Sequence, residues 1–234
     1  MCADGTSPDY FGSTRGPSLM ELTWLGHSCF RLRGKDATLI TDPPAPATGY
    51  TLGRISADIV TISHHHVGHD YARSITGDPR VVDGPGEYEI EQILISGIKT
   101  YHDRERGKLL GRNTAYLVTM DDVELCHLGD LGGPLDDNAQ EALSGADVLL
   151  IPVGGGNSLN AEQAAEVISQ IEPRIIVPMH YATPAYKPHG EGLDPVEKFC
   201  REMGVDVAEP LAKAVITKSS LPIEPQVMIL TYRG

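Results

Sequence analysis

Four histidines lie within residues 63–70, directly after the apolar run at residues 58–62. A neutral imidazole is costly to bury without a partner, and it is the commonest side-chain ligand for zinc-like cations in proteins. Histidines gathered at the end of a strand therefore predict a metal site. A solvated, histidine-rich loop is the alternative, because a histidine tract alone says little about geometry.

Other histidines follow apolar segments much further along the chain. His102, His127 and His180 each come at the end of a short apolar run, and Asp130 follows His127 in a glycine-containing turn. Because α/β folds place their chemistry at strand ends, we expect these ends to meet in the same cleft as the histidine tract. For His127 a buried, hydrogen-bonded role is favoured over metal ligation.

The elements expected to position these residues are mainly strands in the first half of the chain, joined by helices in the second half. Two continuous apolar runs, 147–151 and 174–177, have the pattern of strands buried on both faces. The other expected strands are residues 19–25, 29–32, 37–41, 58–62, 81–83, 93–100, 114–120 and 123–128. Helices are expected over residues 137–143, 161–171 and 195–203. Many strands with helices outside them indicate a layered α/β sandwich.

The composition fits one folded domain with a substantial core. The chain has 234 residues, of which 41% are hydrophobic, and neither a repeat nor a linker divides residues 19–234, which we expect to form a single domain. Residues 1–18 are polar and rich in Gly, Ser and Pro, so a disordered tail without a signal peptide is expected there. The four cysteines form no C-x-x-C pair, which argues against a disulfide scaffold or a cysteine zinc site and favours a cytoplasmic location.

The charge balance narrows the class of partner. Nineteen basic and 32 acidic residues give a net charge of -13, which argues against a nucleic-acid-binding surface. No apolar run is long enough to span a membrane, so no membrane partner is expected. A homo-oligomer is left open.

The order of the histidines and of Asp130 resembles the metallo-β-lactamase superfamily, whose signature is H-x-H-x-D-H, then a distant His, a G-D turn and a final His. Here the order is H-x-H-x-G-H at residues 64–69, then His102, the turn Gly129-Asp130, and His180. The flanking segments W-L-G-H (24–27), T-D-P (41–43), G-P-G-E-Y (84–88), N-T-A-Y (113–116) and P-M-H-Y (178–181) are similar to the branch of prokaryotic metal-dependent hydrolases related to L-ascorbate-6-phosphate lactonase. The resemblance covers nearly everything after residue 19. It implies an α/β fold, a four-layer αββα sandwich, with metals in a cleft at one edge.

The resemblance also implies a role for each motif residue. The ligands of a first metal would be His64, His66 and His102. A second metal would be held by His69 and His180, with Asp130 bridging the two metals. One or two divalent ions are expected. Zinc is the first choice, and manganese and iron stay open because histidine and carboxylate ligands suit all three.

One position departs from the pattern. Gly68 stands where the family has an Asp that ligates the second metal and handles the proton of the attacking water. Glycine can do neither. Asp70 is the nearest substitute, although neighbouring positions in a loop point in different directions.

Four further residues are candidates for the site. His27 would lie near the metals and could take part in catalysis or contact the substrate, or it could be a structural histidine. Asp42 could accept the N–H of a ligand histidine, or it could simply begin a turn before Pro43. Tyr181 and Lys187 could bind an anionic substrate.

Taken with the resemblance, these residues predict a metal-dependent hydrolase that uses metal-bound hydroxide on a small ester, lactone or phosphoester. A non-catalytic metal-binding or ligand-sensing protein that lost the motif Asp at Gly68 is the alternative from a different class. An RNase Z-type nuclease is a further alternative, which the acidic balance disfavours.

Overall fold

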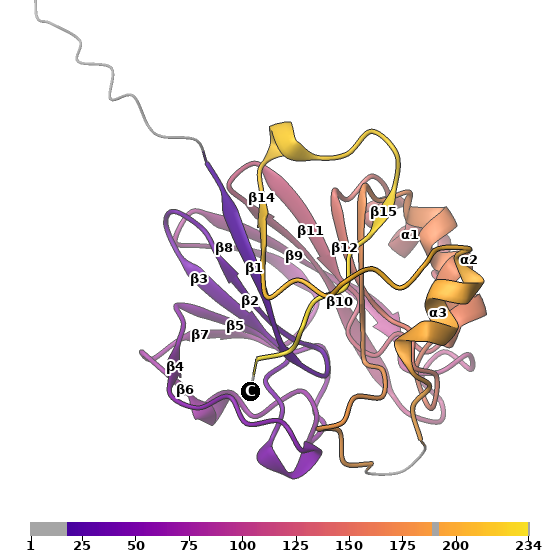
Figure 1. Cartoon of the computed structure of the whole chain (residues 1–234). Coiled ribbons are helices and arrows are strands. Elements are labelled where there is room, and N and C mark those ends of the chain that lie inside the picture. The colour runs from indigo at the N-terminus through magenta and orange to yellow at the C-terminus, as the bar shows by residue number, and fades with distance from the viewer. Residues whose placement is uncertain (1–17, 189–191, 234) are drawn as a thin grey trace, which may run out of the picture.

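The computed structural model describes residues 18–188 and 192–233, and in these residues two β-sheets pack face to face (Figure 1). The first sheet has the order β14-β1-β2-β3-β5-β7. Its strands are β1 (Met20–Gly26), β2 (Cys29–Arg33), β3 (Thr38–Thr41), β5 (Ile59–Thr61), β7 (Arg80–Val82) and β14 (Ala214–Ile216). Neighbours β3, β5 and β7 are parallel, so their carboxyl ends lie at one edge of the sheet. The predicted disordered tail falls outside the described residues, except for Ser18.

The second sheet has the order β15-β13-β12-β11-β10-β9-β8. Its strands are β8 (Gly86–Ile90), β9 (Ile93–Tyr101), β10 (Arg112–Met120), β11 (Val123–His127), β12 (Val148–Pro152), β13 (Ile175–Met179) and β15 (Gln226–Val227). The strands from β8 to β11 are antiparallel, whereas β11, β12, β13 and β15 are parallel. Each strand expected from the sequence is present. The sequence pattern did not indicate β8, β14 or β15, nor the two-residue strands β4 and β6 at residues 55–56 and 75–76.

The α-helices all come from the second half of the described chain and lie together beside the second sheet (Figure 1). They are α1 (Asp137–Leu143), α2 (Ala161–Ile171) and α3 (Val196–Glu202). The predicted capping box of α2 is present, because Asn160 Oδ1 accepts the Gln163 N–H at 3.0 Å and Gln163 Oε1 accepts the Asn160 N–H at 2.9 Å. The bounds of α2 agree with the prediction.

The outer face of the first sheet is covered differently. Alternate residues of its strands point to opposite faces, so Leu39 joins the main core between the sheets while Ile40 joins a second, smaller cluster on the outer face. That cluster packs under the short ribbon of β4 (Ile55–Ser56) and β6 (Ile75–Thr76) and under the 3₁₀ turn at Ala72–Ser74. The α/β metallo-β-lactamase fold is therefore present, and in the described residues its outer layer on the first sheet is made of loops and a β-ribbon.

The carboxyl ends of several strands from both sheets meet at one edge of the sandwich. Asp42 follows β3, the histidine tract follows β5, and His102 follows β9. Asp130 and His180 follow β11 and β13 of the parallel part of the second sheet. The fold thus brings together residues that are up to about 140 positions apart, as the positions of His180 and Asp42 show.

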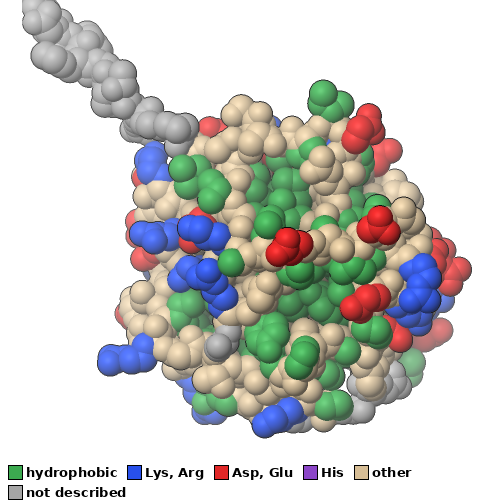
Figure 2. Space-filling view, viewed as in Figure 1, with side chains coloured by type: hydrophobic (Ala, Val, Ile, Leu, Met, Phe, Trp, Pro, Cys, Tyr) green, Lys and Arg blue, Asp and Glu red, His purple; other side chains and the backbone are tan. Residues whose placement is uncertain are grey.

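The face that carries β14 and β15 exposes apolar side chains. Figure 2 shows hydrophobic side chains gathered between these two strands. Within the part of the chain that the structure describes, no helix is both long and apolar enough to cross a bilayer.

Candidate metal centre

Six histidines and one aspartate come together in one cleft. Their ligand atoms form three overlapping groups, and within each group all atoms lie within 4.8 Å of one another. The groups are His27 with His69 and His180, His64 with His66 and His69, and His64 with His102 and Asp130. All the histidines predicted as ligands, and the predicted bridging aspartate, are therefore brought together. Clustered imidazole nitrogens and one carboxylate suit divalent transition cations.

Asp130 lies at the centre of the cluster and is 3% exposed. Its Oδ2 lies 3.1 Å from His69 Nε2, 3.4 Å from His102 Nε2 and 3.9 Å from His64 Nε2. Its Oδ1 lies 3.2 Å from His180 Nε2. One carboxylate thus faces histidines from both sides of the cleft, as the predicted bridging role requires.

Asn113 of β10 holds the turn that carries Asp130. Its Oδ1 accepts the Asp130 N–H at 3.0 Å. Its side-chain amide donates to Thr100 Oγ1 at 2.6 Å and to the Leu128 carbonyl at 2.9 Å. Gly129 has a φ of +58° and no room for a Cβ, since that atom would lie 2.5 Å from Asn113 Oδ1. The glycine therefore allows the Asn113 side chain to reach the backbone of Asp130.

The histidine tract folds into a tight turn after β5. The His69 N–H donates to the His66 carbonyl at 2.9 Å, which brings alternate imidazoles to the same side. His65 points outward with a side chain that is 71% exposed, and its Nδ1 lies 3.5 Å from Asp70 Oδ2. Asp70 therefore faces His65, which is not one of the predicted ligands, and Asp70 is not among the residues that line the cleft. The predicted use of Asp70 in place of the missing motif carboxylate is wrong, because the turn directs it away from the cluster.

Asp42 makes the predicted hydrogen bond to a site histidine. His69 Nδ1 lies 2.7 Å from Asp42 Oδ2, and both side chains are fully buried. Asp42 also accepts the Ser63 N–H at 2.7 Å and the Ser63 hydroxyl at 2.6 Å. The Asp42 carboxylate therefore fixes the ring of His69 and the start of the histidine tract together.

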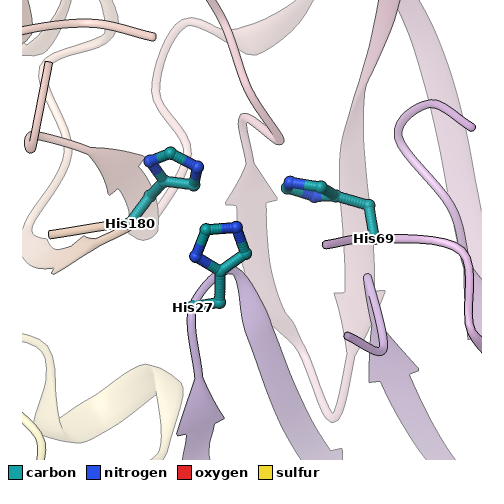
Figure 3. A group of neighbouring side chains, drawn as sticks. All are labelled: His27, His69 and His180. Carbon is teal, nitrogen blue, oxygen red and sulfur yellow. The ribbon is translucent and has the colours of Figure 1, made fainter. Parts of the chain in front are cut away.

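Three of the histidines form a buried group, which we call the buried triad: His27, His69 and His180. Figure 3 shows their imidazoles turned toward a common point, from the β1–β2 turn, from the histidine tract and from the end of β13. The ring centroids of His27 and His180 are 4.1 Å apart, and those of His27 and His69 are 5.1 Å apart. The remaining histidines, His64, His66 and His102, form what we call the open set, because it contains His66, the exposed histidine among the six.

The hydrogen bonds of the rings leave one nitrogen of each ring directed into the cleft. Ser63 donates its single hydroxyl proton to Asp42, so the neighbouring His64 Nδ1, at 3.1 Å, must donate its proton to Ser63 Oγ. In the same way Ser158 donates to the Gly155 carbonyl, and His180 Nδ1 donates to Ser158 Oγ at 3.3 Å. The Nε2 atoms of His64 and His180 then carry lone pairs that face the Asp130 carboxylate.

Several buried polar atoms of the cleft have no hydrogen-bond partner within the described residues. They are His27 Nδ1, His64 Nε2, His69 Nε2, His102 Nδ1 and Asp130 Oδ1. Three of these atoms, His64 Nε2, His69 Nε2 and Asp130 Oδ1, lie in the space around the Asp130 carboxylate, and buried polar atoms are almost always satisfied, so this group needs an explanation. Lone pairs facing a carboxylate repel one another unless a cation or a proton lies between them. The residues present therefore fit a divalent cation.

The electrostatics of the cleft agree with this reading. Burial would raise the pKa of Asp130, but His180 and His69 beside it hold that pKa well below its usual value. Burial would lower the pKa of His69, but Asp130 and Asp42 raise it to about 10. Burial lowers the pKa of His64 to about 3, and burial together with His180 and His69 holds the pKa of His27 well below its usual value. Asp130 also outweighs burial at His102 and raises its pKa, so without a cation the cluster favours protons on the rings beside Asp130, where a cation would compete for them.

The structure also tests the two residues predicted to bind an anionic substrate. Tyr181 is 6% exposed and packs in the hydrophobic core, with its ring centroid 5.0 Å from that of Trp24. The prediction for Tyr181 is wrong, because the chain turns its side chain inward directly after His180. Lys187 is exposed, and its backbone N–H donates to the Thr48 carbonyl at 2.8 Å. It is not among the residues that line the cleft, so its contact with substrate stays a prediction.

The cleft around the histidines has a volume of about 200 Å³. Besides site residues and Gly68 it is lined by Thr48, His65, Val67, Leu110, Gly156, Asn157, Tyr186 and Leu193. A larger groove of about 1050 Å³ lies near α2 and β15, but no histidine is among the described residues that line it. The small cleft is therefore the site of interest, and its size favours a small ligand.

Sequence reasoning missed several residues that orient the site, chiefly Ser63, Asn113 and Ser158. They act through hydrogen bonds to ligand histidines or to the Asp130 backbone. Ser63 stood next to the histidine tract, and Asn113 was part of a flanking segment of the family resemblance, so both carried a signal. Ser158 lies in an unremarkable loop before α2, and no local pattern distinguishes it.

Comparison with known proteins agrees with the fold and the cluster. Residues 21–180 match the family described as the Beta-lactamase superfamily domain, so the chain belongs to this superfamily. A UPF0173 metal-dependent hydrolase of Methanopyrus kandleri is 24% identical over 219 residues, which cover 80% of this chain and 94% of the relative.

Solved structures support the same assignment. A crystal structure from Thermotoga maritima, named as a candidate Zn-dependent hydrolase of the metallo-β-lactamase superfamily, is 33% identical with a TM-score of 0.74. The match covers 92% of this chain and 100% of that one. The diiron β-hydroxylase CmlA of Streptomyces venezuelae has a TM-score of 0.60 at 14% identity, over 87% of this chain and 55% of that one, which shows likeness of fold alone.

Proposed function

We propose that this protein is a metal-dependent hydrolase that cleaves a small ester, lactone or phosphoester in the histidine cleft. The observation that carries the proposal is the convergence of six imidazoles and the Asp130 carboxylate, with buried polar atoms that no group of residues 18–188 and 192–233 satisfies. The names of the relatives support the hydrolase class, since both are described as metal-dependent or Zn-dependent hydrolases.

In this proposal the open set and Asp130 hold one cation, and His69, His180 and Asp130 contribute to a second site. Zinc is favoured over manganese or iron, because most of the donor atoms are imidazole nitrogens. Bound cations would supply Lewis-acid activation of water and of the carbonyl or phosphoryl group that is attacked.

The chain's own residues have separate tasks in the reaction. Asp42, Ser63 and Ser158 fix the rings of His69, His64 and His180 by accepting their Nδ1 protons, so that each Nε2 faces the cleft. Apolar side chains at the mouth, Val67, Leu110 and Leu193, exclude water from part of the cleft. Thr48, Asn157 and Tyr186 are the polar side chains placed to orient a small substrate.

A non-catalytic metal-binding or ligand-sensing protein is the second candidate. The observation that favours it is Gly68, which offers no carboxylate to handle the proton of the attacking water. In either case the partner is a small molecule, and an anionic one is preferred because cations would line the cleft.

The test uses protein purified without chelator, with metal content measured by mass spectrometry and hydrolysis assayed on p-nitrophenyl acetate, a γ-lactone and bis-p-nitrophenyl phosphate. Asp130→Asn removes the shared carboxylate, and Asp206→Asn, at an exposed loop position, is the matched control. We expect one or two bound cations per chain, and turnover that Asp130→Asn abolishes and Asp206→Asn keeps. Bound metal without turnover on any substrate would favour the sensing protein, and the absence of bound metal in the wild type would overturn both.

A further inference from the structure

The reason for a glycine at position 68 is visible in the structure. Gly68 is buried, and its φ lies outside the left-handed region, so the backbone conformation does not require glycine there. The lack of room at this position requires glycine, because a Cβ would lie 2.8 Å from His27 Nε2 and 3.0 Å from His27 Cδ2. Real Cβ atoms do not approach other atoms so closely. The imidazole of His27 therefore occupies the volume where the side chain of residue 68 would begin.

His27 is held in this position by its backbone. It sits in the turn between β1 and β2 with a φ of +54°, which is an uncommon conformation for a non-glycine residue. Its carbonyl accepts the indole N–H of Trp24 at 3.0 Å and the backbone N–H of His180 at 3.2 Å. The second of these bonds ties the turn directly to the end of β13. The backbone of His27 is thus held to Trp24 and to His180, and the ring of His27 lies 4.1 Å from that of His180, centroid to centroid.

The same ring faces the other members of the buried triad. One ligand atom each of His27, His69 and His180 lies within 4.8 Å of the other two, and the three residues are 5%, 0% and 7% exposed. Figure 3 shows the three rings arranged around one space. Three imidazoles around one point, with further coordination from a shared carboxylate or water, form a common metal site in proteins.

We propose that His27 is the third histidine ligand of the second cation, beside His69, His180 and the shared Asp130, and takes the place that a carboxylate at residue 68 has in the family pattern. Gly68 and His27 then form one adaptation, in which the absence of a side chain at position 68 makes room for a ligand from the β1–β2 turn. This inference rests on the proposed function, because it requires that the cleft holds cations.

The exchange of an aspartate for a histidine alters the chemistry of the second site. The protein ligands of both sites then carry a single negative charge, on Asp130, in place of two. Imidazole nitrogens favour zinc, cobalt and nickel over the oxygen-preferring manganese and magnesium. The site should therefore discriminate strongly against manganese, and the pair of cations would attract an anionic ligand more strongly.

The inference is tested by titrating metal-free protein with Co²⁺, Zn²⁺ and Mn²⁺ and measuring stoichiometry and affinity by calorimetry and by Co²⁺ absorption spectra. We expect two Co²⁺ per chain in the wild type and a second-site affinity that falls at least about 100-fold in His27→Ala, since a direct ligand contributes more than an outer partner. His65→Ala is the matched control and should keep both sites, because this imidazole at the rim of the cleft is exposed, faces Asp70 and belongs to none of the three ligand groups. The double variant His27→Ala/Gly68→Asp should restore the second site with a weaker preference for Co²⁺ over Mn²⁺.

The outcomes separate this inference from the proposed function. Two equally tight cations in both wild type and His27→Ala would overturn the role of His27 and leave the proposed function intact. A wild type that binds one cation, unaffected by His27→Ala, would also overturn it, and a wild type that binds none would overturn both. Should His27→Ala fail to fold, imidazole ¹⁵N spectra of the wild type give the answer. The His27 signals should shift with the same equivalent of Zn²⁺ as those of His180, and unshifted His27 signals would refute ligation.

Discussion

The buried triad and the open set are two halves of one cleft, and they differ in the exposure of one ring, that of His66, and in the groups that orient them. His102 of the open set is as buried as His180 of the buried triad, at 8% and 7% exposed. His69 and its orienting carboxylate Asp42 are both fully buried, whereas His66 is exposed and receives only a long contact, at 3.4 Å, from the Gly68 N–H. The open set keeps every residue of the family pattern. The buried triad is the half in which the pattern is broken.

This difference shows that a sequence motif can lack a residue while the side chains around the corresponding site are already ordered. A buried site pays little extra conformational entropy on binding, because its side chains are already ordered. An exposed ring such as that of His66 must be ordered when the cation arrives. Rigid placement of His27, His69 and His180 can therefore compensate for a missing carboxylate at the site where that carboxylate is absent.

The largest expected effect comes from the residue that the two halves share. Asp130→Asn keeps the size of the side chain and removes the charge that faces four histidines. We expect loss of both cations and a fall in kcat of at least about 10³-fold, which corresponds to about 4 kcal/mol of lost transition-state stabilisation. Metal analysis and steady-state kinetics measure these effects. Retention of both cations would mean that the two halves act independently of Asp130.

The next largest effect is expected from weakening the open set while the buried triad is kept. The double variant His64→Ala/His66→Ala removes two imidazoles of the open set and leaves the buried triad untouched. We expect the stoichiometry to fall from two cations to one, with the remaining cation keeping its affinity to within about 10-fold, since Asp130 is still present. Calorimetric titration of the metal-free protein with Zn²⁺ measures this change. Full occupancy of both sites in this variant would contradict the assignment of the open set.

A smaller effect is expected from the carboxylate that orients the buried triad. Asp42→Asn keeps the shape but removes the charge that accepts the His69 Nδ1 proton at 2.7 Å. We expect the affinity of the second site to fall about 10- to 100-fold, with the first site much less affected. Because Asp42 helps to raise the pKa of His69, that pKa should also fall in the metal-free variant. Equal weakening of both sites would show that Asp42 supports the histidine tract as a whole, through Ser63, and not His69 in particular.

The sequence was sufficient to predict the strands that carry the site. Apolar runs such as 147–151 and 174–177 mark strands buried on both faces, and the capping residues Asn160 and Gln163 mark the start of α2. The short edge strands β14 and β15 were not predictable in this way. They are two or three residues long and pair with neighbours far away in the sequence, so their strand conformation depends on tertiary contacts.

Within the site, the convergence of the predicted ligand histidines and Asp130 could be foreseen because the family order is kept. The exceptions have a common physical cause. Whether His27 or Asp70 faces the cleft depends on the direction of a side chain in a turn, and no periodicity reports that direction. Tyr181 was misplaced for the same reason, since it lies next to His180 in the chain but points into the core.

The smallest effect tests whether a neutral group can orient a ligand of the buried triad. Ser158 accepts the His180 Nδ1 proton at 3.3 Å, a longer and uncharged contact than that of Asp42 with His69. Ser158→Ala removes this acceptor with little change in volume, and we expect the affinity of the second site to fall by only about 3- to 10-fold, below the effect of Asp42→Asn. Ser144→Ala, at the end of α1 and away from the cleft, is the control. Because charge-assisted hydrogen bonds are roughly twice as strong as neutral ones, a larger loss in Ser158→Ala than in Asp42→Asn would invert the comparison. It would mean that the buried triad depends mainly on the position of β13 and the loop before α2, and less on the carboxylate beneath the histidine tract.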